Sequence, residues 1–299
     1  MQIFYTDQFE LPLPDGHRFP MRKYAILRDR VEAANLSQGE QLRVPQGASC
    51  EQILRAHDAD YLKRVLSGTL APSEIRRIGF PWTEQMVERS RRSSGATVEA
   101  CRAASQHGVA VSLAGGTHHA FRGHGAGFCV FNDCAIAALA MQIEGRAKRI
   151  LIIDCDVHQG DGTAAILADD SSVFTFSIHA AKNFPFRKVE SDLDIALPDY
   201  CDDETYLSAL HDGLCYALSA SRPDLAIYLA GADPFEGDRL GRLSLSKKGL
   251  ARRDQMLFTT CTDMSVPVAT VMAGGYASRI EDTVDIHFNT VRLAAAIHR

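Results

Sequence analysis

A short stretch in the middle of the chain places two carboxylates and an imidazole close together. Asp156 and His158 are separated by one residue and follow the apolar run 150–153. Because alternate residues of an extended chain point to the same side, both side chains can enter one cleft. A third carboxylate, Asp233, follows another apolar run. Two carboxylates and one imidazole leave a position open for water, so the trio predicts a metal site that activates water and polarises a carbonyl.

Two adjacent histidines, His118 and His119, follow the apolar run 109–113. Asp154 and Asp161 are available to orient them, and a carboxylate that accepts from one ring nitrogen raises the basicity of the other. Beside a metal-bound water, such pairs would supply a general base and a proton donor. On an extended turn the two rings cannot both face one way. Taken alone, the pair could equally lie at the surface, just as Asp156 alone could cap a helix.

Tyr276 follows two glycines at the end of the apolar run 266–272. Small residues let the backbone bend sharply there, so the phenol could donate to an oxyanion. The alternative is an ordinary turn in which Tyr276 only packs against its neighbours. Each polar segment alone also has a purely structural interpretation. The prediction of an active site therefore rests on their combination.

The glycine-rich stretch 123–127 is the next candidate for a binding loop. It has neither G-x-G-x-x-G after a strand nor a Walker lysine, so it does not predict phosphate binding. With Phe128 and Phe131 beside it, a turn leading into a narrow apolar passage is the better interpretation. Phe184 and Phe186 would line the opposite wall of this passage.

Apolar runs and helical segments alternate along the chain. Apolar, β-branched runs lie at 109–113, 150–153, 173–177, 225–229 and 266–272. Segments with helical periodicity lie at 51–66, 84–106, 132–144, 203–221, 247–264 and 281–298. This order predicts an α/β fold of three layers, with helices on both faces of a mostly parallel central sheet. Since the alternation is unbroken, we expect one domain over residues 1–299, with its site at the carboxyl ends of the strands.

The composition is that of an ordinary folded protein. The 299 residues are 46% hydrophobic, and 32 Lys and Arg stand against 37 Asp and Glu, a formal net charge of −5. This balance excludes intrinsic disorder and argues against nucleic-acid binding. No stretch approaches the roughly 18 apolar residues of a membrane span, and residues 1–25 lack a signal-peptide core. We therefore expect a cytoplasmic protein without membrane partners, whose eight cysteines, lacking a C-x-x-C pair, are reduced.

Four motifs together resemble the zinc-dependent histone deacetylase superfamily. They are Gly115-Gly-Thr-His-His-Ala, Asp154-x-Asp-x-His-x-x-Asp161-Gly, Gly231-Ala-Asp233 and Gly274-Gly-Tyr276. Similar segments run from Phe4 to Ile297. The sequences of residues 16–24 and 156–163 most resemble the class IV type and its bacterial relatives. The resemblance implies an arginase/deacetylase-like fold. It also implies hydrolysis of an N-acyl-lysine amide in a protein or peptide, or of a related small amide.

The resemblance implies a role for each polar residue. His119 would be the main general base and acid, with His118 as an electrostatic or proton-shuttling partner. Asp154 would orient His118, Asp161 would orient His119, and Tyr276 would polarise the scissile carbonyl. One Zn²⁺ per chain would be bound by Asp156, His158 and Asp233.

Further residues are carried over for the channel and for a structural ion. The substrate channel would contain Gly127, Phe128, Phe186, Leu240 and Gly274. A K⁺ would lie near the backbone of Asp154, Asp156 and His158, with Ser177 and Ile178. The chain departs from the family pattern at Asp133, which stands where some members have an asparagine. This departure concerns the base of the channel rather than the metal.

Three other functions compete with this interpretation. A dimanganese ureohydrolase shares the fold but favours Asp-x-His-x-Asp, whereas here the next acid is Asp161 and Gly231 stands where a further ligand would be. A non-catalytic acyl-binding protein would have lost a ligand or the tyrosine. An acetylpolyamine deacetylase would carry an acidic gatekeeper where this chain has Leu240, although Glu236 is close. We expect a single-metal lysine deacylase, with polyamine or small-amide deacetylation as the alternative.

Overall fold

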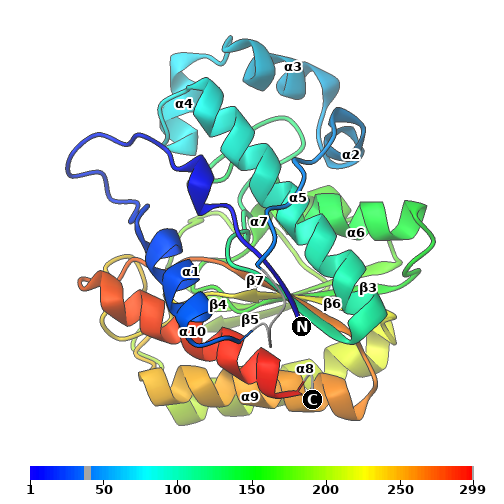
Figure 1. Ribbon diagram of the computed structural model, residues 1–299. Coiled ribbons are helices and arrows are strands. Elements are labelled where there is room, and N and C mark those ends of the chain that lie inside the picture. The colour runs from blue at the N-terminus through cyan, green and yellow to red at the C-terminus, as the bar shows by residue number, and fades with distance from the viewer. Residues whose placement is uncertain (37–41, 298–299) are drawn as a thin grey trace.

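Seven strands form one sheet in the computed structural model, which describes residues 1–36 and 42–297. Their order is β1-β2-β7-β6-β3-β4-β5, and every neighbouring pair is parallel (Figure 1). The strands are β1 (Gln2–Phe4), β2 (Val109–Ser112), β3 (Ile150–Asp154), β4 (Val173–Ala180), β5 (Leu193–Leu197), β6 (Leu225–Ala230) and β7 (Val268–Met272). This sheet confirms the predicted α/β class.

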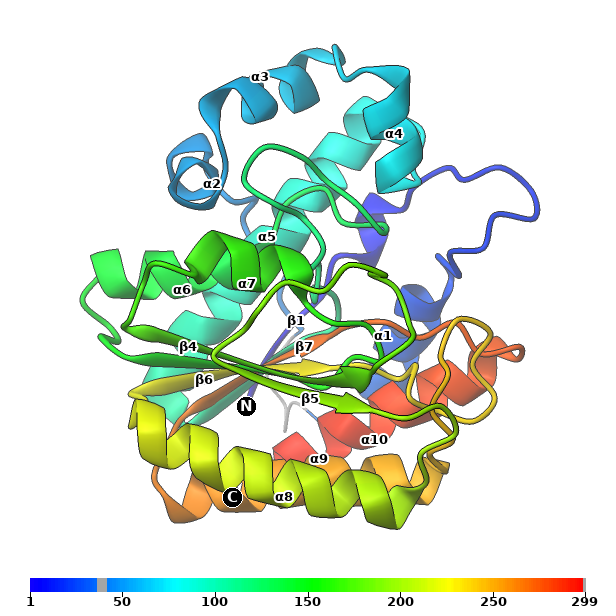
Figure 2. The same ribbon diagram turned by 180° about the vertical axis from the view of Figure 1, so that it is seen from behind.

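Helices cover both faces of the sheet, as expected for parallel strands joined by crossovers. Figures 1 and 2 show α1, α8, α9 and α10 on one face and α5, α6 and α7 on the other, with α2, α3 and α4 beyond α5. The helices are α1 (Lys23–Ala33), α2 (Cys50–Ala56), α3 (Ala59–Ser67), α4 (Pro72–Ile78), α5 (Glu84–His107), α6 (Asp133–Ile143), α7 (Asp161–Leu167), α8 (Asp203–Ser221), α9 (Lys247–Asp263) and α10 (Ile280–Ile297), with a 3₁₀ turn at Asp7–Phe9.

The central strand β3 shows why the sheet has a core on each side. Its residues are all buried, and they alternate between the two faces. Ile150 and Ile152 belong to the core beneath α5 and α6, whereas Leu151 and Ile153 belong to the core against α8, α9 and α10. A period of two in a fully apolar run places side chains in both cores. No helix in the described part of the chain combines the length and apolar character needed to cross a membrane.

Two features differ from the expected elements. The helix expected over 51–66 is wrong, because α2 ends at Ala56 and α3 begins at Ala59. Between them, His57 is extended and its ring accepts from the backbone N–H of Asn132 and contacts the Phe121 carbonyl, both at 2.9 Å. The strand expected from residue 266 starts at Val268, after Pro267, which has no N–H to donate. Residue 298, the expected end of the last helix, lies outside the described residues.

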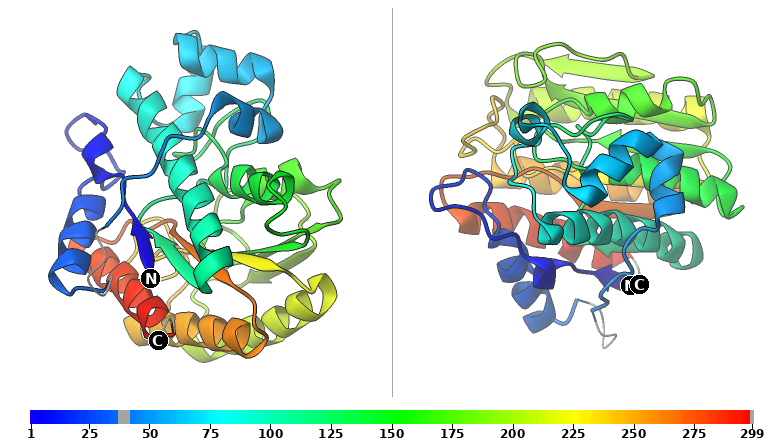
Figure 3. Two further views of the ribbon diagram at one scale, coloured as in Figure 1. Left: turned by 45° about the vertical axis from the view of Figure 1, so that its right-hand side comes forward. Right: turned by 90° about the horizontal axis from the view of Figure 1, so that it is seen from above.

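Several short elements were not expected at all. The strand β1 has only three residues, and β5 lies at the sheet edge with alternate residues exposed. The helices α1, α4 and α7 are 7 to 11 residues long, too short for a clear helical period. Seen from above, the segment that contains α2, α3 and α4 crosses in front of the sheet, whereas α1 lies apart from it, near β1 (Figure 3).

Candidate metal-dependent active site

Four neighbouring strands bring polar segments to one edge of the sheet. The strands β2, β7, β6 and β3 are adjacent in the sheet order, and all run the same way. Their carboxyl ends therefore lie side by side, and the segments that follow them carry the histidine pair, Tyr276, Asp233 and Asp156. This arrangement is the one expected from the alternation of the sequence.

The three predicted metal ligands converge at this edge. One ligand atom from each of Asp156, His158 and Asp233 lies within 4.8 Å of the others. His158 Nδ1 is 2.9 Å from Asp156 Oδ1 and 3.2 Å from Asp233 Oδ2. Among the described residues, Asp233 Oδ2 finds no hydrogen-bond partner although it is buried. An orphaned carboxylate oxygen beside a ring nitrogen and a second carboxylate fits a divalent cation that takes mixed nitrogen and oxygen ligands.

The backbone holds the other carboxylate oxygens of this trio. Gly274 N–H donates to Asp156 Oδ2 at 2.7 Å, and Val157 N–H donates to Asp233 Oδ1 at 3.0 Å. Burial and the negative charge of Asp156 raise the pKa of Asp233 to about 7. A cation between the two carboxylates would relieve this repulsion, which is a second reason to regard the trio as a metal site.

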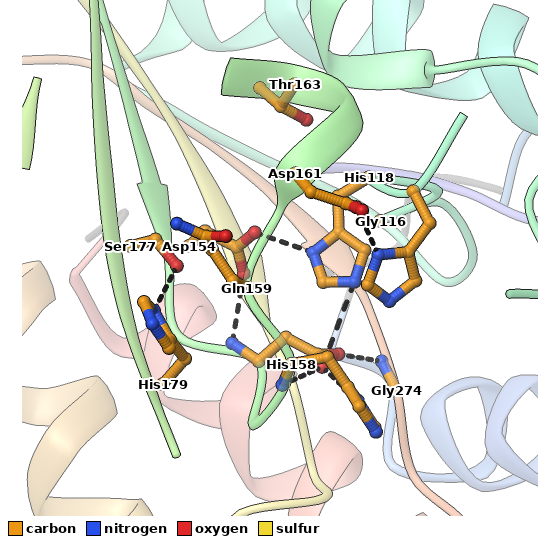
Figure 4. A network of polar contacts seen from close by, with 12 residues as sticks. Gly116, His118, Asp154, His158, Gln159, Asp161, Thr163, Ser177, His179 and Gly274 are labelled. Atoms are coloured by element: carbon orange, nitrogen blue, oxygen red, sulfur yellow. Dashed lines mark hydrogen bonds and ion pairs between the residues drawn. The ribbon is translucent and has the colours of Figure 1, made fainter. Parts of the chain in front are cut away.

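Each histidine of the adjacent pair has its own carboxylate. His118 Nδ1 lies 2.6 Å from Asp154 Oδ2, and His119 Nδ1 lies 2.7 Å from Asp161 Oδ1. Figure 4 shows His118 pointing towards Asp154, with His158 below it. The ring centroids of His118 and His119 are only 4.1 Å apart, and both rings line the same cavity. The expectation that they face different ways is wrong, because the chain turns at these residues instead of staying extended.

The surroundings of the two histidines shift their pKa values in opposite directions. Burial lowers the pKa of His118, but the carboxylates of Asp154 and Asp156 outweigh this and raise it to about 9. Burial and the positive charge of His118 lower the pKa of His119 to about 4. These opposite shifts favour a protonated His118 and a neutral His119. If Nδ1 of a neutral His119 donates to Asp161, its Nε2 is free to accept a proton.

Tyr276 is buried beside the metal trio and lines the cavity. Burial raises its pKa well above the usual value, so its phenol stays protonated and can donate. Its backbone N–H donates to Asp238 Oδ2 at 2.6 Å, and the same carboxylate accepts from the N–H groups of Leu240 and Gly241. Asp238 thus ties the loop after Asp233 to Tyr276. This role could not be predicted from the sequence, because Asp238 is one of several acids in an irregular loop.

A cavity of about 740 Å³ leads to these residues. Gly127 has a φ of 53°, and a Cβ there would lie 2.7 Å from the His119 ring, so close packing requires glycine. Phe128, Leu240 and Phe186 line the cavity as well. Of the two phenylalanines after β4, it is Phe184 that contacts the reaction site, with its ring 4.8 Å from that of His119. Phe186 is 88% exposed and belongs to the outer part of the wall.

Asp133 supports the loop that carries the histidines. Its carboxylate is fully buried and accepts from the backbone N–H groups of Gly116 and Thr117 at 3.0 and 2.7 Å. The Thr97 hydroxyl donates to it at 2.6 Å. Asp133 is therefore joined to the loop before the histidine pair, and it is not itself among the residues that line the cavity.

The cysteines and the remaining network lie around this centre. All eight cysteines are free, and only Cys50 and Cys215 are exposed. Near Asp154, Ser177 Oγ lies 3.0 Å from His179 Nδ1 (Figure 4). The Gln159 amide donates to Asp194 at 2.7 Å. Asp154 and Ser177 are register partners in β3 and β4.

Several known proteins are similar to this chain in sequence, in fold or in both. A histone deacetylase domain matches residues 17–291. An uncharacterised protein of Picosynechococcus is 44% identical over 296 residues, covering 99% of both chains. Histone deacetylase 2 of Arabidopsis thaliana is 26% identical, over 92% of this chain and 74% of its own length. The crystal structure of a histone deacetylase homologue in complex with SAHA has a TM-score of 0.85 and 25% identity, covering 98% of this chain and 83% of that one.

The domain match extends over most of the chain, and it includes all four polar segments that meet at the sheet edge. The fold agrees as well, since the crystal structure of a histone deacetylase homologue from Aquifex aeolicus has a TM-score of 0.84 over 98% of this chain. The protein therefore belongs to the histone deacetylase family and is a hydrolase that acts on acyl amides.

Proposed function

We propose that the protein is a zinc-dependent deacylase of N-acyl-lysine in proteins or peptides. The observation that carries this proposal is the convergence of Asp156, His158 and Asp233 beside two His–Asp pairs at the end of one cavity. These three residues would hold a single Zn²⁺. When bound, the metal would lower the pKa of the water that it coordinates and would polarise the substrate carbonyl.

The residues around the metal site then divide the proton transfers between them. His119, neutral and oriented by Asp161, takes a proton from the attacking water through Nε2. The protonated Tyr276 donates a hydrogen bond to the carbonyl oxygen as negative charge develops on it. The proton then passes to the amine nitrogen as the C–N bond breaks. His118, held cationic by Asp154, stabilises the negative charge that develops on the substrate. It can also pass a proton to His119.

The cavity provides a path for the substrate side chain. We propose that the lysine methylenes pass between Phe128 and Phe184, with Gly127 allowing close approach to His119. Phe186 and Leu240 would contact the substrate nearer the surface, and Gly274 would hold the floor beside the metal. Leu240 offers no charge to a cationic chain, which favours acyl-lysine over acetylpolyamines.

The acids around the trio favour one metal rather than two. In the described residues, Asp156, His158 and Asp233 are the one group of three or more potential ligands that are close enough to share an ion. Asp154 and Asp161, which a second metal would need, face the two histidines instead.

We also propose a single domain over residues 1–299 and a K⁺ at the backbone of Asp154, Asp156 and His158 with Ser177 and Ile178. The register pairing of β3 with β4 supports that ion site.

The test compares acyl-lysine peptides of increasing acyl length with acetylated polyamines, using protein that carries one equivalent of zinc and protein treated with chelator. We expect zinc-dependent release of the carboxylic acid from the peptides and slower release from the polyamines. Two bound manganese ions with release of urea from a guanidino substrate would contradict the proposal. Peptide binding without turnover, equal in wild type and His119→Ala, would instead indicate a non-catalytic acyl-binding protein.

A further inference from the structure

The cavity that ends at the proposed metal ligands is lined by many more cations than carboxylates. Six exposed cationic residues, which we call the cationic rim, line its outer part: Arg18, Arg76, Arg77, Lys182, Arg239 and Arg242. Asp156, itself a proposed metal ligand, is the one carboxylate among the lining residues. The whole chain has a net charge of −5, so the positive charge of this cavity is opposite in sign to that of the protein as a whole.

The cationic rim is assembled from four separate segments. They are the loop before α1, the end of α4, the turn after β4 and the loop after β6. Two rim residues are fixed by their contacts with the proposed site. The Arg77 carbonyl accepts from Gly127 N–H at 3.0 Å, and Arg239 Nε donates to the Tyr276 carbonyl at 3.0 Å. The rim charges therefore surround the point where a substrate would enter.

Within the described part of the chain, most of the rim residues have no carboxylate partner of their own. Arg242 and Lys182 share one carboxylate, that of Asp199, at 2.7 and 4.0 Å. The other four arginines of the rim have no carboxylate within 4.0 Å among the described residues. Glu74, the acid that precedes the pair on α4, is bound by Arg64 at 2.9 Å instead. The rim thus presents unpaired guanidinium groups, which bind carboxylates through two parallel hydrogen bonds.

Two buried cations extend the positive potential into the cavity. Lys23 is 2% exposed, and its Nζ donates to the carbonyls of Ala273 and Gly275, at 3.4 and 3.3 Å. Arg89 is 7% exposed and lies 4.6 Å from the Tyr24 ring centroid. Neither has a carboxylate within 4.0 Å in the described part of the chain. Cationic side chains therefore line the cavity beyond its mouth as well, which adds to the attraction for anions.

From this distribution of charge we propose that the protein selects acyl-lysine flanked by acidic residues, whose carboxylates bind the cationic rim. The inference rests on the proposed function and narrows its substrate class. An acylated lysine has lost its own charge, so carboxylates on either side of it dominate the charge of the peptide. The same rim repels peptides with basic flanks and repels polyamines.

The test uses three acyl-lysine peptides of equal length, in which the residues flanking the acyl-lysine are Glu, Gln or Lys. At low ionic strength we expect kcat/KM to be highest for the Glu peptide, by about 5- to 20-fold over the Gln peptide, and lowest for the Lys peptide. The advantage should shrink in 0.3 M NaCl, because exposed charges are screened. Equal kcat/KM for the three peptides, or a preference for Lys, would overturn the proposal.

Matched variants separate the rim from general charge effects. The double variant Arg76→Gln with Arg77→Gln removes two rim charges, and Lys148→Gln removes an exposed charge at the amino end of β3, outside the cavity lining. We expect the Glu-to-Gln ratio to fall towards one in the double variant and to stay at the wild-type value in Lys148→Gln. An unchanged ratio in the double variant would refute the role of the rim. If no peptide is hydrolysed, the proposed function fails, while fluorescence anisotropy of the labelled Glu, Gln and Lys peptides still decides the charge preference.

Discussion

At the scale of single residues, Gly274 shows how closely the backbone approaches the proposed metal ligands. A Cβ at this position would overlap Asp233 Oδ2 and would lie 2.6 Å from Asp156 Oδ2. Its N–H is also the donor that holds Asp156. The positions of both carboxylates therefore require glycine at residue 274, although Gly274 has no side chain that could bind a metal.

We expect Gly274→Ala to weaken zinc binding about 10- to 100-fold, the range for changes to groups that orient metal ligands. Gly47→Ala is the matched control, because its Cβ would make an ordinary contact, 3.5 Å from Arg91 Cβ. The measurement is a competition titration of the metal-free proteins with zinc and a chelator of known affinity. Equal affinities in the two variants would show that the approach of Gly274 is not important for the metal.

The histidine pair yields a second prediction at this scale. His119→Ala removes the neutral acceptor and should reduce kcat by about 10²- to 10⁴-fold without changing the zinc content, because His119 is not one of the ligands. His211→Ala, an exposed histidine on α8, is the control and should retain wild-type kcat. Steady-state assays with metal analysis decide the matter. A His119→Ala protein with wild-type kcat would exclude this residue as the general base.

At the scale of elements, the corner between α2 and α3 is fixed by one imidazole. His57 is buried, and its two ring nitrogens contact the Phe121 carbonyl and the Asn132 N–H, so the corner is joined to the start of α6. Burial lowers the pKa of His57 to about 4, against an ordinary 6.5. The neutral ring is thus required by the folded state, whereas the unfolded chain takes up a proton already near pH 6.5.

This shift makes part of the stability depend on pH. Between pH 6.5 and 4 the unfolded state binds more protons at His57, so the free energy of unfolding falls as the pH falls, by about 3 kcal/mol from this residue. We expect His57→Gln, whose amide oxygen can accept from Asn132 N–H, to show a flatter pH dependence in this window. Urea unfolding at several pH values measures the slope. Identical slopes in wild type and variant would show that His57 does not contribute to the pH dependence.

At the scale of the whole molecule, the proposed metal connects separate parts of the sheet. Asp156 and His158 follow β3, and Asp233 follows β6, two strands that are paired but separated by about 70 residues of chain. The unfolded chain does not hold these ligands together, so binding of a metal to the folded state adds directly to its stability.

We expect zinc to raise the melting temperature and a chelator to lower it. When free zinc exceeds the Kd 1,000-fold, the gain in the free energy of unfolding is about 4 kcal/mol. Asp233→Ala removes one ligand, so its melting temperature should respond much less to zinc. Differential scanning calorimetry of both proteins with and without zinc provides the comparison. A wild-type melting temperature that does not depend on zinc would argue against a metal at this trio.

The sequence by itself determined the class of fold and the main polar groups of the site. Apolar runs such as 150–153 predict buried parallel strands from local pattern alone, and residues directly after them must reach the same edge. This is why Asp156, His158 and Asp233 could be named as a group. Helix and strand boundaries were not predicted where the element is too short to show a period, as in β1, or where a local side chain bonds a distant segment, as His57 does.

Only the tertiary structure decided which groups meet across long separations. The close approach of the His118 and His119 rings depends on a turn held by Asp133, and the contact of Phe184 with His119 joins two distant loops. The support of Tyr276 by Asp238 and the gathering of the cationic rim belong to the same class. The physical reason is common to all of them. Local sequence sets how each segment bends, whereas packing of the segments against one another decides which charges and rings come together.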